Sequence, residues 1–398
     1  MDAKDMSVKG FRFASCAAGI KKKGKLDLAL IVSDKPAQCA GVFTRNKVVA
    51  APVVLSRAVT ERGCCQAILV NSGNANACTG AQGASDAQRC AELAAEVLEM
   101  PLEQVVVSST GVIGVPLPMG CFERSVPALT GQLSVDGASS VAEAIMTTDS
   151  YSKMATQRIE RREGSYTILG IAKGAGMIHP DMATMLAFVL CDAEVEQDLL
   201  RQALTRCVEK SFNSITVDGD TSTNDMVLVL ANGEAGGEKI TAGSAAAEEF
   251  EAALQVVLID LAKMIVRDGE GATKLVEVSV QGALDDEQAR TAARAVATSS
   301  LVKTAFFGED ANWGRIIAAV GYSGAEIDEA KATLCFEDAE VYRFGVTTGP
   351  EAEARASEVL KRPEFKVIVD LGLGNGCASY YTSDLSYDYV RINADYRT

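Results

Sequence analysis

The scarcest informative residue in this 398-residue sequence is histidine, which occurs once, as His179. Metal sites built from several histidines are therefore excluded, and any Ser-His-Asp or Cys-His catalysis would have to use this one residue. The 11 cysteines include no CxxC pair. We therefore expect neither a zinc site nor a disulfide framework, and most of the cysteines should be small buried hydrophobes in a reducing compartment.

Long hydrophobic runs are also missing. The longest apolar stretches, such as Met185 to Cys191 and Val256 to Leu261, are far shorter than the roughly 20 residues that a membrane span requires. The first ten residues contain charges from the second position onward and lack an apolar signal core. The sequence therefore predicts a cytoplasmic protein without a membrane segment.

Basic residues are outnumbered by acidic ones, 38 to 53, which gives a formal net charge of −15. The basic residues are also scattered along the chain. This balance disfavours the large phosphate-binding surface of a nucleic-acid-binding protein. The one basic cluster comprises Lys21, Lys22, Lys23 and Lys25. We interpret it as a solvated turn around Gly24.

What the sequence does contain is an alternation of short β-type runs and amphipathic helices, which predicts an α/β or α+β fold. Most of the strand candidates are continuously apolar, as expected for sheets covered on both faces. They are residues 67–70, 104–109, 166–171, 185–191, 226–230, 275–280 and 366–371.

Helical periodicity is clearest at 196–212 and 247–266, with further helices expected at 85–99, 286–298 and 312–320. Between Val280 and Asp286 a β-run gives way through a glycine to the start of a polar helix. We therefore predict a domain boundary there, with a first domain at 1–283 and a second at 284–398.

The most unusual local sequence is KGAGMIHPDMATML, residues 173–186. Strand candidates precede and follow it, and its glycines and proline impose an irregular path between them. Thr184 stands at the head of the second strand. Composition alone makes Thr184 an ordinary β-branched residue at a strand start.

The run GMIHPDMATML, residues 176–186, closely resembles the signature of the ornithine acetyltransferase family. Segments resembling the same family occur in its order along nearly the whole chain. They are 70–77, 108–114, 147–149, 218–225, 268–274 and 393–398.

This resemblance implies a layered α/β sandwich of the self-processing, N-terminal-nucleophile type, with a smaller C-terminal α+β domain. It also implies autocatalytic cleavage between Ala183 and Thr184, which would give an α chain of residues 1–183 and a β chain of 184–398. Two copies of each chain commonly assemble in the family, so an α2β2 heterotetramer is expected.

Cleavage would give Thr184 a free α-amino group with an unperturbed pKa of about 7.7–8.0. Near neutral pH that amine can accept the proton of the threonine hydroxyl, which is a weak nucleophile without a base. The resemblance assigns the oxyanion hole of the acyl transfer to Thr110 and Gly111.

The substrates carry charges that the site has to match. Acetylornithine has a carboxylate and an ammonium group, and glutamate has two carboxylates and an amine. The resemblance implies Lys173 for a carboxylate and Glu270 for the ammonium group. It adds Thr147, Asn393, the terminal Thr398 and Thr184 itself as substrate-binding positions.

The implied reaction is acetyl transfer from N2-acetyl-L-ornithine to L-glutamate in arginine biosynthesis, by a ping-pong mechanism through an acetyl ester on Thr184. No cofactor or metal is expected. Some members of the family also make N-acetylglutamate from acetyl-CoA, which makes acetyl-CoA a possible second substrate of a multifunctional enzyme.

Two alternatives remain open. The first is an N-terminal-nucleophile aminopeptidase or amidase, in which water is the acceptor. The second is a non-catalytic protein that binds a small molecule and retains the fold. His179 lies five residues from Thr184, but we expect it to belong to a turn and to be non-catalytic.

Overall fold

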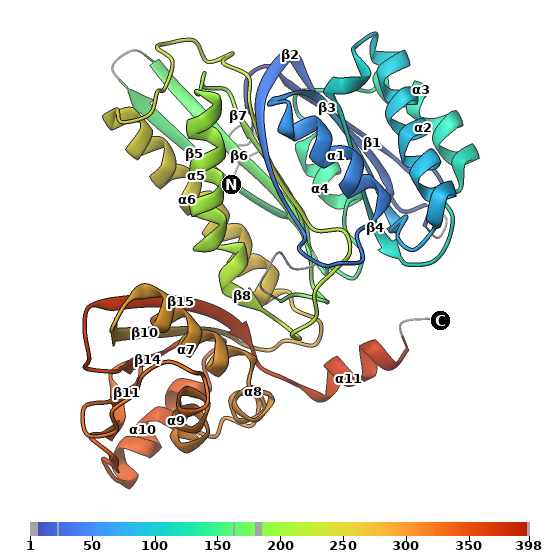
Figure 1. Ribbon diagram of the computed structural model, residues 1–398. Helices are drawn as coiled ribbons and strands as arrows, with labels where there is room; N and C mark the ends of the chain where they lie inside the picture. Colours follow the sequence, from blue (N-terminus) through green and yellow to red (C-terminus); the bar gives the residue numbers. More distant parts are fainter. Residues whose placement is uncertain (1–6, 22–23, 162–163, 180–184, 396–398) are drawn as a thin grey trace. The chain divides into compact units, whose positions relative to one another are not determined.

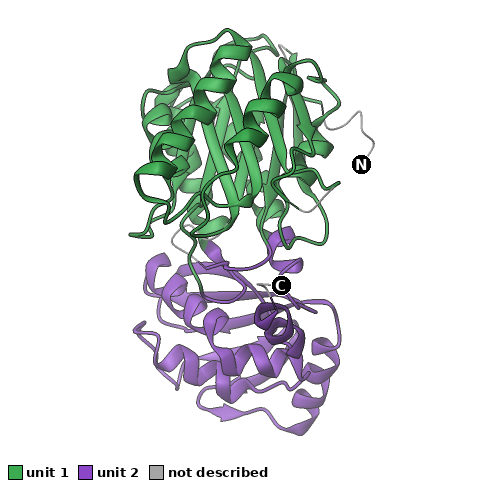
Figure 2. Ribbon diagram, turned by 90° about the vertical axis from the view of Figure 1, so that its right-hand side faces the viewer, with its two compact units in different colours: residues 1–174, 181–213, 220–262 green, residues 175–180, 214–219, 263–398 purple. Residues whose placement is uncertain are grey.

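The computed structural model describes residues 7–21, 24–161, 164–179 and 185–395. The chain divides into two compact units (Figure 2), the first comprising 1–174, 181–213 and 220–262 and the second 175–180, 214–219 and 263–398. This division differs from the predicted boundary after residue 283, which falls at the end of strand β10 (Leu275–Ala283). Because β10 is hydrogen-bonded on both sides within the sheet of the second unit, it belongs to that unit.

The first unit alternates strands and helices along most of its length (Figure 1). Its strands are β1 (Phe11–Cys16), β2 (Leu28–Phe43), β3 (Cys64–Asn74), β4 (Val105–Val112), β5 (Lys153–Arg161), β6 (Gly164–Lys173), β7 (Leu186–Cys191) and β9 (Met226–Ala231). Its helices are α1 (Ala51–Glu61), α2 (Gly80–Leu98), α3 (Met119–Thr130), α4 (Ala138–Ala144), α5 (Gln197–Glu209) and α6 (Ala245–Arg267), with a short 3-10 helix at Leu102–Gln104 and another at Phe212–Ser214.

Within the described residues, the strands of the first unit form one eight-stranded sheet in the order β4-β3-β2-β9-β7-β6-β5, with β1 also paired to β2. The early part of β2 pairs with β1 and β3, and its last residues pair with β9 instead. The register shifts between Val32 and Ala37, where Pro36 removes a backbone donor. The sheet folds over at this point, because side chains of β6 and β4 touch although four strands separate them along the path.

The folding of the sheet creates an apolar layer between its two parts. One buried cluster combines residues of β1, β3 and β4 with residues of β6, β7 and β9. A second cluster fills the space between the β3 and β4 part and helices α2 and α3. On the other part, α6 lies so close to β6 that a Cβ at Gly170 would come within 2.6 Å of Leu261. The result is the layered α/β sandwich that the sequence predicts.

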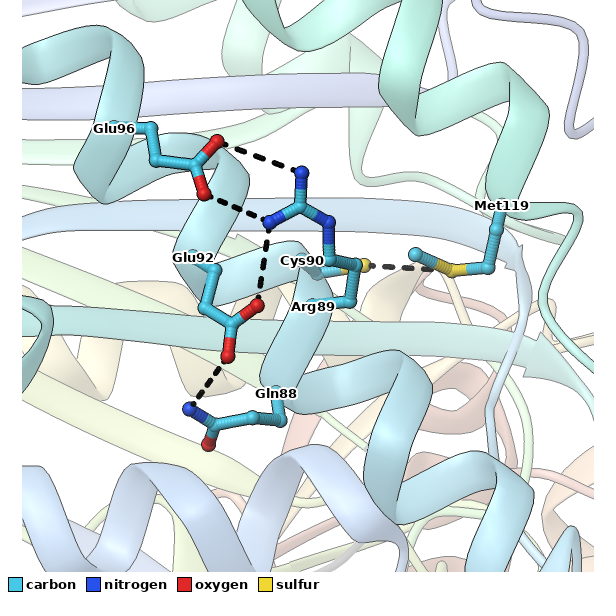
Figure 3. Close-up of polar contacts among 6 residues, drawn as sticks. All are labelled: Gln88, Arg89, Cys90, Glu92, Glu96 and Met119. Carbon is cyan, nitrogen blue, oxygen red and sulfur yellow. Dashed lines mark hydrogen bonds and ion pairs between the residues drawn. The ribbon is translucent and has the colours of Figure 1, made fainter.

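Helix α2 illustrates how one helix serves both solvent and core (Figure 3). Arg89 contacts Glu92 and Glu96 on its polar face, while Cys90 points toward Met119 at the start of α3, with 4.0 Å between the sulfur atoms. The exposed ion pairs add little to stability. The apolar face, which packs against α3 and the sheet, holds the helix in place.

The second unit is an α+β structure with its own core. In the described part of the chain its strands form a seven-stranded sheet in the order β13-β12-β11-β14-β10-β15-β8. Besides β10, these are β8 (Ile215–Thr216), β11 (Thr333–Phe336), β12 (Ala339–Arg343), β13 (Val346–Thr347), β14 (Glu364–Asp370) and β15 (Gly376–Ser383). Its helices are α7 (Asp286–Thr298), α8 (Ser300–Phe307), α9 (Trp313–Gly321), α10 (Pro350–Leu360) and α11 (Tyr387–Ala394).

Every strand and helix that the sequence predicts is present, with ends shifted by a few residues. The continuously apolar strands β7 and β9 are buried along their full length, as sheets covered on both faces require. Among the described residues, no helix is both long and apolar enough to cross a lipid bilayer.

Candidate active site

Lys173 and Thr110 meet inside the first unit. Lys173 is the last residue of β6 and Thr110 lies near the end of β4, and the Lys173 Nζ is 3.2 Å from the Thr110 Oγ1. Both side chains are buried, with 3% and 4% exposure. An ammonium group is only a donor, so the threonine oxygen accepts this hydrogen bond. The hydroxyl hydrogen of Thr110 then remains available to a third group.

Gly111 has a conformation that an L side chain rarely adopts. Its φ is +134°, and a Cβ there would lie 2.3 Å from the carbonyl carbon of Gly73 and 2.5 Å from the backbone nitrogen of Asn74. Backbone atoms cannot move aside as a flexible side chain can. The position therefore requires glycine for two independent reasons.

The Thr110 and Gly111 segment rests on a network of buried amides. Ser109 donates its hydroxyl to Asn71 Oδ1 at 2.7 Å, and Asn71 Nδ2 donates to the carbonyl of Asn74 at 2.9 Å. Asn224, just before β9, donates to the carbonyls of Ala75 and Ser109 at 2.7 and 2.9 Å. The asparagine-rich 70–77 segment thus holds the end of β4 in one geometry.

Asp149 organises the positive side of this region. Its carboxylate accepts hydrogen bonds from Lys153 Nζ at 2.8 Å, from the amide of Gly174 at 2.6 Å and from the amide of Thr147 at 2.9 Å. Burial by itself would raise the pKa of Asp149, but the charges of Lys173 and Lys153 outweigh burial and lower the pKa to about 2. The carboxylate therefore stays ionised and fixes Thr147 and the residue after Lys173.

Lys21 contributes a further cation. Its Nζ donates to the carbonyls of Met146 at 2.6 Å, Leu26 at 3.0 Å and Ala144 at 3.3 Å. The predicted solvated turn was wrong for this residue, because its side chain is half-buried and its Nζ is bound by backbone carbonyls, two of them from the distant 144–146 segment. Burial lowers the pKa of Lys21 to about 8, against the attraction of Asp27, and the nearby charge of Lys173 lowers it further.

Asp225 is a fully buried carboxyl group at the start of β9. Its Oδ1 accepts the backbone amide of Met185 at 3.0 Å, whereas its Oδ2 makes no hydrogen bond to any described residue. Burial raises the pKa of Asp225 well above its usual range, although the Met185 amide and the charge of Lys173 act in the opposite direction. The group lies against the residue that directly follows Thr184 in the chain.

Glu270 and Asn393 meet in the second unit. Asn393 Nδ2, on α11, donates to Glu270 Oε2 at 2.9 Å, and the Glu270 amide donates to the carbonyl of Ala175 at 2.9 Å. A Cβ at Gly176 would lie 2.5 Å from the Glu270 carboxyl group. This carboxylate is therefore held against the glycine segment that precedes His179.

His179 also belongs to the second unit. Its Nδ1 lies 3.5 Å from Thr216 Oγ1 and its Nε2 lies 3.3 Å from an Arg294 guanidinium nitrogen. The backbone just before it is irregular, with a φ of +59° at Met177, and the carboxylate of Asp218 accepts the amides of Met177 and Ile178. Pro180, the other residue of the expected turn, lies outside the described residues, so the turn stays a prediction.

Comparison with known proteins places this arrangement in a family. A sequence profile of the ArgJ family matches residues 12–398. The arginine biosynthesis bifunctional protein ArgJ of Syntrophotalea carbinolica is 60% identical over 393 residues, which cover 99% of this chain and 100% of the relative. The protein of the same name from Geobacter sulfurreducens is 56% identical, with the same coverage. The chain belongs to the ArgJ family.

A solved structure agrees with this membership. The crystal structure of the ArgJ protein of Bacillus halodurans is 47% identical, with a TM-score of 0.51, and the match covers 52% of this chain and 97% of that chain. The resemblance read from residues 176–186 is thereby confirmed at the level of the family.

In this ArgJ-family chain, the predicted site residues fall into two sets. Thr110, Gly111, Thr147 and Lys173 lie together in the first unit, and Glu270 and Asn393 form a pair in the second. Ala183, Thr184 and Thr398 lie outside the described residues.

Sequence reasoning missed the polar groups that support the first set, namely Asp149, Lys153, Asp225 and Lys21. A weak signal existed for the pair Asp149 and Lys153, since a lysine at the start of a strand and an aspartate four residues earlier can form an ion pair. Both side chains are completely buried, with 0% exposure. This burial depends on the tertiary structure and could not be predicted from the local sequence.

Proposed function

We propose that the chain transfers an acetyl group from N2-acetyl-L-ornithine to L-glutamate, through an acetyl ester on Thr184, in arginine biosynthesis. The observation that carries the proposal is the buried contact of Lys173 with Thr110, beside a glycine whose geometry admits no side chain. It occurs in a chain that is 60% identical to a relative named as an arginine biosynthesis bifunctional protein. The enzyme is thus an acyltransferase.

The chain is first matured by a single cleavage between Ala183 and Thr184. The Thr184 hydroxyl attacks the Ala183 carbonyl, the amide becomes an ester, and water hydrolyses the ester, which leaves a carboxylate on Ala183 and a free α-amino group on Thr184. The freed α-amino group then accepts the hydroxyl proton when Thr184 attacks the acetyl carbonyl of acetylornithine. Ornithine leaves, and glutamate collects the acetyl group from the ester.

The oxyanion that forms in each half of the reaction needs donors fixed in advance. The hydroxyl of Thr110 is suited to this role because its oxygen is occupied by the Lys173 ammonium group, which leaves its hydrogen free to donate. The amide of Gly111 is the second donor. The amide network around Asn71 and Asn224 keeps both donors in place.

The charges of the substrates need complementary groups in the protein. Lys173, with the segment around Thr147 that Asp149 fixes, binds a carboxylate. Glu270, held by Asn393, binds the side-chain ammonium group of ornithine. Thr398 is the remaining substrate-binding position, and neither a metal nor a cofactor takes part.

The solved relative from Bacillus halodurans supports cleavage. The match covers 97% of the chain in that structure but only 52% of the present chain. The chain in that structure is therefore about half as long as the present one. That length is expected for one product of a cut near the middle of the sequence. We propose that both products stay associated as a cytoplasmic α2β2 heterotetramer.

Mass spectrometry and an acceptor assay test the function together. The purified protein should consist of fragments 1–183 and 184–398, whereas Thr184→Ala should remain one chain without activity. Acetylornithine alone should add one acetyl group to the 184–398 fragment, and glutamate should remove it as N-acetylglutamate. An intact chain with full activity would refute the mechanism. Equal acetate release with and without glutamate would instead favour the aminopeptidase or amidase alternative.

A further inference from the structure

The first unit contains an open cavity of about 760 Å³ outside the residues assigned above. The end of β2, the 44–49 loop, α1 and α5 surround it, so all of its walls belong to one unit. Its apolar lining residues include Phe43 and Val49. The volume lies within the range of small-molecule sites, about 300–1,000 Å³.

The charges around this cavity are mostly positive. Arg45, Arg57 and Arg201 line it, and Glu61 is the only carboxylate among the described lining residues. The arginines come from the loop, α1 and α5 respectively. The whole chain carries a net charge of −15, so this local excess of guanidinium groups is opposite in sign to the net charge of the protein. A positively charged cavity favours an anionic ligand.

Two of the arginines are placed to receive such a ligand. Arg57 lies over the ring of Phe43, 5.6 Å from its centroid, and donates to the carbonyl of Thr44 at 3.4 Å. Neither Arg57 nor Arg201 has a carboxylate oxygen within 4.0 Å in the described part of the chain. A planar guanidinium group can donate two parallel hydrogen bonds to two oxygens of one phosphate, which the ammonium group of lysine does less well.

The cavity lies close to the catalytic end of the sheet. Phe43 pairs with Met226 of β9, and Met226 pairs with Leu186 of β7. Two strand spacings, about 10 Å, therefore separate the backbone of Phe43 from that of Leu186. Leu186 stands two residues after Thr184 in the chain.

A chain of hydrogen bonds links the same two places. The amide of Thr44, which lines the cavity, donates to the carbonyl of Asp225 at 3.0 Å, and Asp225 Oδ1 accepts the amide of Met185 at 3.0 Å. The backbone that lines the cavity is thus tied through Asp225 to the start of β7.

We propose that this arginine pocket, formed by Arg45, Arg57 and Arg201, binds the phosphate groups of a phosphorylated small molecule. Two sources share this chemistry: the phosphates of acetyl-CoA as a second acyl donor, or a free phosphorylated effector. The acetyl-CoA source rests on the proposed acetyl transfer, whereas phosphate binding itself does not.

Calorimetric titration of the purified protein, containing all residues 1–398 whether cleaved or not, with inorganic pyrophosphate tests binding without any activity. The double variant Arg57→Gln/Arg201→Gln should bind pyrophosphate at least about tenfold more weakly than the unaltered protein. The single variant Arg201→Gln, which disturbs no intramolecular hydrogen bond among the described residues, should show part of that loss. Arg206→Gln is the matched control, because Arg206 lies on the same helix but is paired with Glu251.

A displacement experiment with coenzyme A and kinetic assays distinguish the two sources of the phosphate groups. If acetyl-CoA is the ligand, coenzyme A displaces pyrophosphate, and Arg201→Gln raises the KM for acetyl-CoA by the same factor by which it weakens pyrophosphate binding, while the KM for acetylornithine stays unchanged. If the ligand is a free effector, pyrophosphate changes the rate with acetylornithine and coenzyme A does not compete. The proposal is overturned if pyrophosphate fails to bind, or if it binds Arg57→Gln/Arg201→Gln as well as the unaltered protein. Neither result depends on whether acetylornithine is a substrate.

Discussion

The buried carboxyl group of Asp225 accepts the backbone amide of Met185 at 3.0 Å, one residue after the predicted nucleophile. The contact adds a side-chain hydrogen bond to the ladder that pairs β7 with its parallel neighbour β9. The carboxyl group is fully buried and its other oxygen makes no hydrogen bond to the described residues. Its protonation state therefore bears directly on the stability of this region.

Asp225 should make stability fall as the pH rises. Burial raises its folded-state pKa well above the unfolded value, so the native protein holds a proton that the unfolded chain has lost, and stability declines from about pH 4 upward until the folded pKa is passed. Asp225→Asn mimics the protonated acid and keeps an acceptor for Met185. Urea unfolding at pH 5 and pH 8 should show a smaller loss of stability at pH 8 in this variant. An unchanged pH dependence would contradict the expectation.

Lys303 in the second unit should act in the opposite direction. Burial lowers its pKa to about 7, although Asp384 and Asp218 attract the proton. Between about pH 7 and pH 10.4 the unfolded chain binds a proton that the native state lacks, so stability should rise with pH across this range. Thermal melting should show a larger gain from pH 7 to pH 9.5 in the unaltered protein than in Lys303→Met.

That comparison needs a control, because Lys303 also donates to Thr382 at 2.9 Å and to the carbonyl and hydroxyl of Ser383. Lys303→Met therefore lowers the melting temperature at every pH. The titration is tested only by the change in melting temperature between pH 7 and pH 9.5. An equal change in the unaltered protein and in Lys303→Met would exclude a contribution from the titration of Lys303.

Replacing Lys173 should impair catalysis more than folding. Lys173→Met removes the cation that contacts Thr110 and that we propose binds a substrate carboxylate, so kcat/KM for acetylornithine should drop about 100-fold or more. Lys173→Arg keeps the charge but not the point-like ammonium group, so it should recover only part of the activity. Circular dichroism verifies that each variant is folded. Activity within twofold of the unaltered protein for Lys173→Met would remove Lys173 from the mechanism.

Gly111→Ala should lose both activity and stability. A Cβ there would lie 2.3 Å from backbone carbon of Gly73, in addition to the cost of a positive φ, and we expect a destabilisation of about 2 kcal/mol or more. Gly114→Ala is the matched control, because Gly114 also has a positive φ of +84° but no atom within 4 Å of the added Cβ. Denaturant unfolding and the acetyl-transfer assay should separate the two variants. Equal behaviour would mean that the contact with Gly73 is not decisive.

Local pattern identified the regular elements well where burial was continuous. Strands such as β7 and β9, and helix α7, whose bounds match the predicted 286–298, each bury a periodic set of apolar residues that is visible in the sequence. Strand β2 was not predicted, because the polar 33–38 segment with Pro36 interrupts its apolar runs where the strand passes from one part of the sheet to the other.

By itself the sequence determined the family, because a long contiguous match needs no knowledge of contacts, and it predicted the segment that carries the nucleophile. It also determined most of the apolar elements, since each residue's tendency to avoid water is local information. Thr184 itself lies outside the described residues, so its role rests on that match.

Only the tertiary structure decided which polar groups are buried together. Lys173 and Thr110 are 63 residues apart, and Asp225 and Met185 are 40 apart. The periodicity of apolar residues along the chain does not predict contacts between residues so far apart. A buried charge is tolerated only where distant segments supply its partners, and the folding of the sheet at β2 and the pairing of β7 with β9 bring those segments into contact.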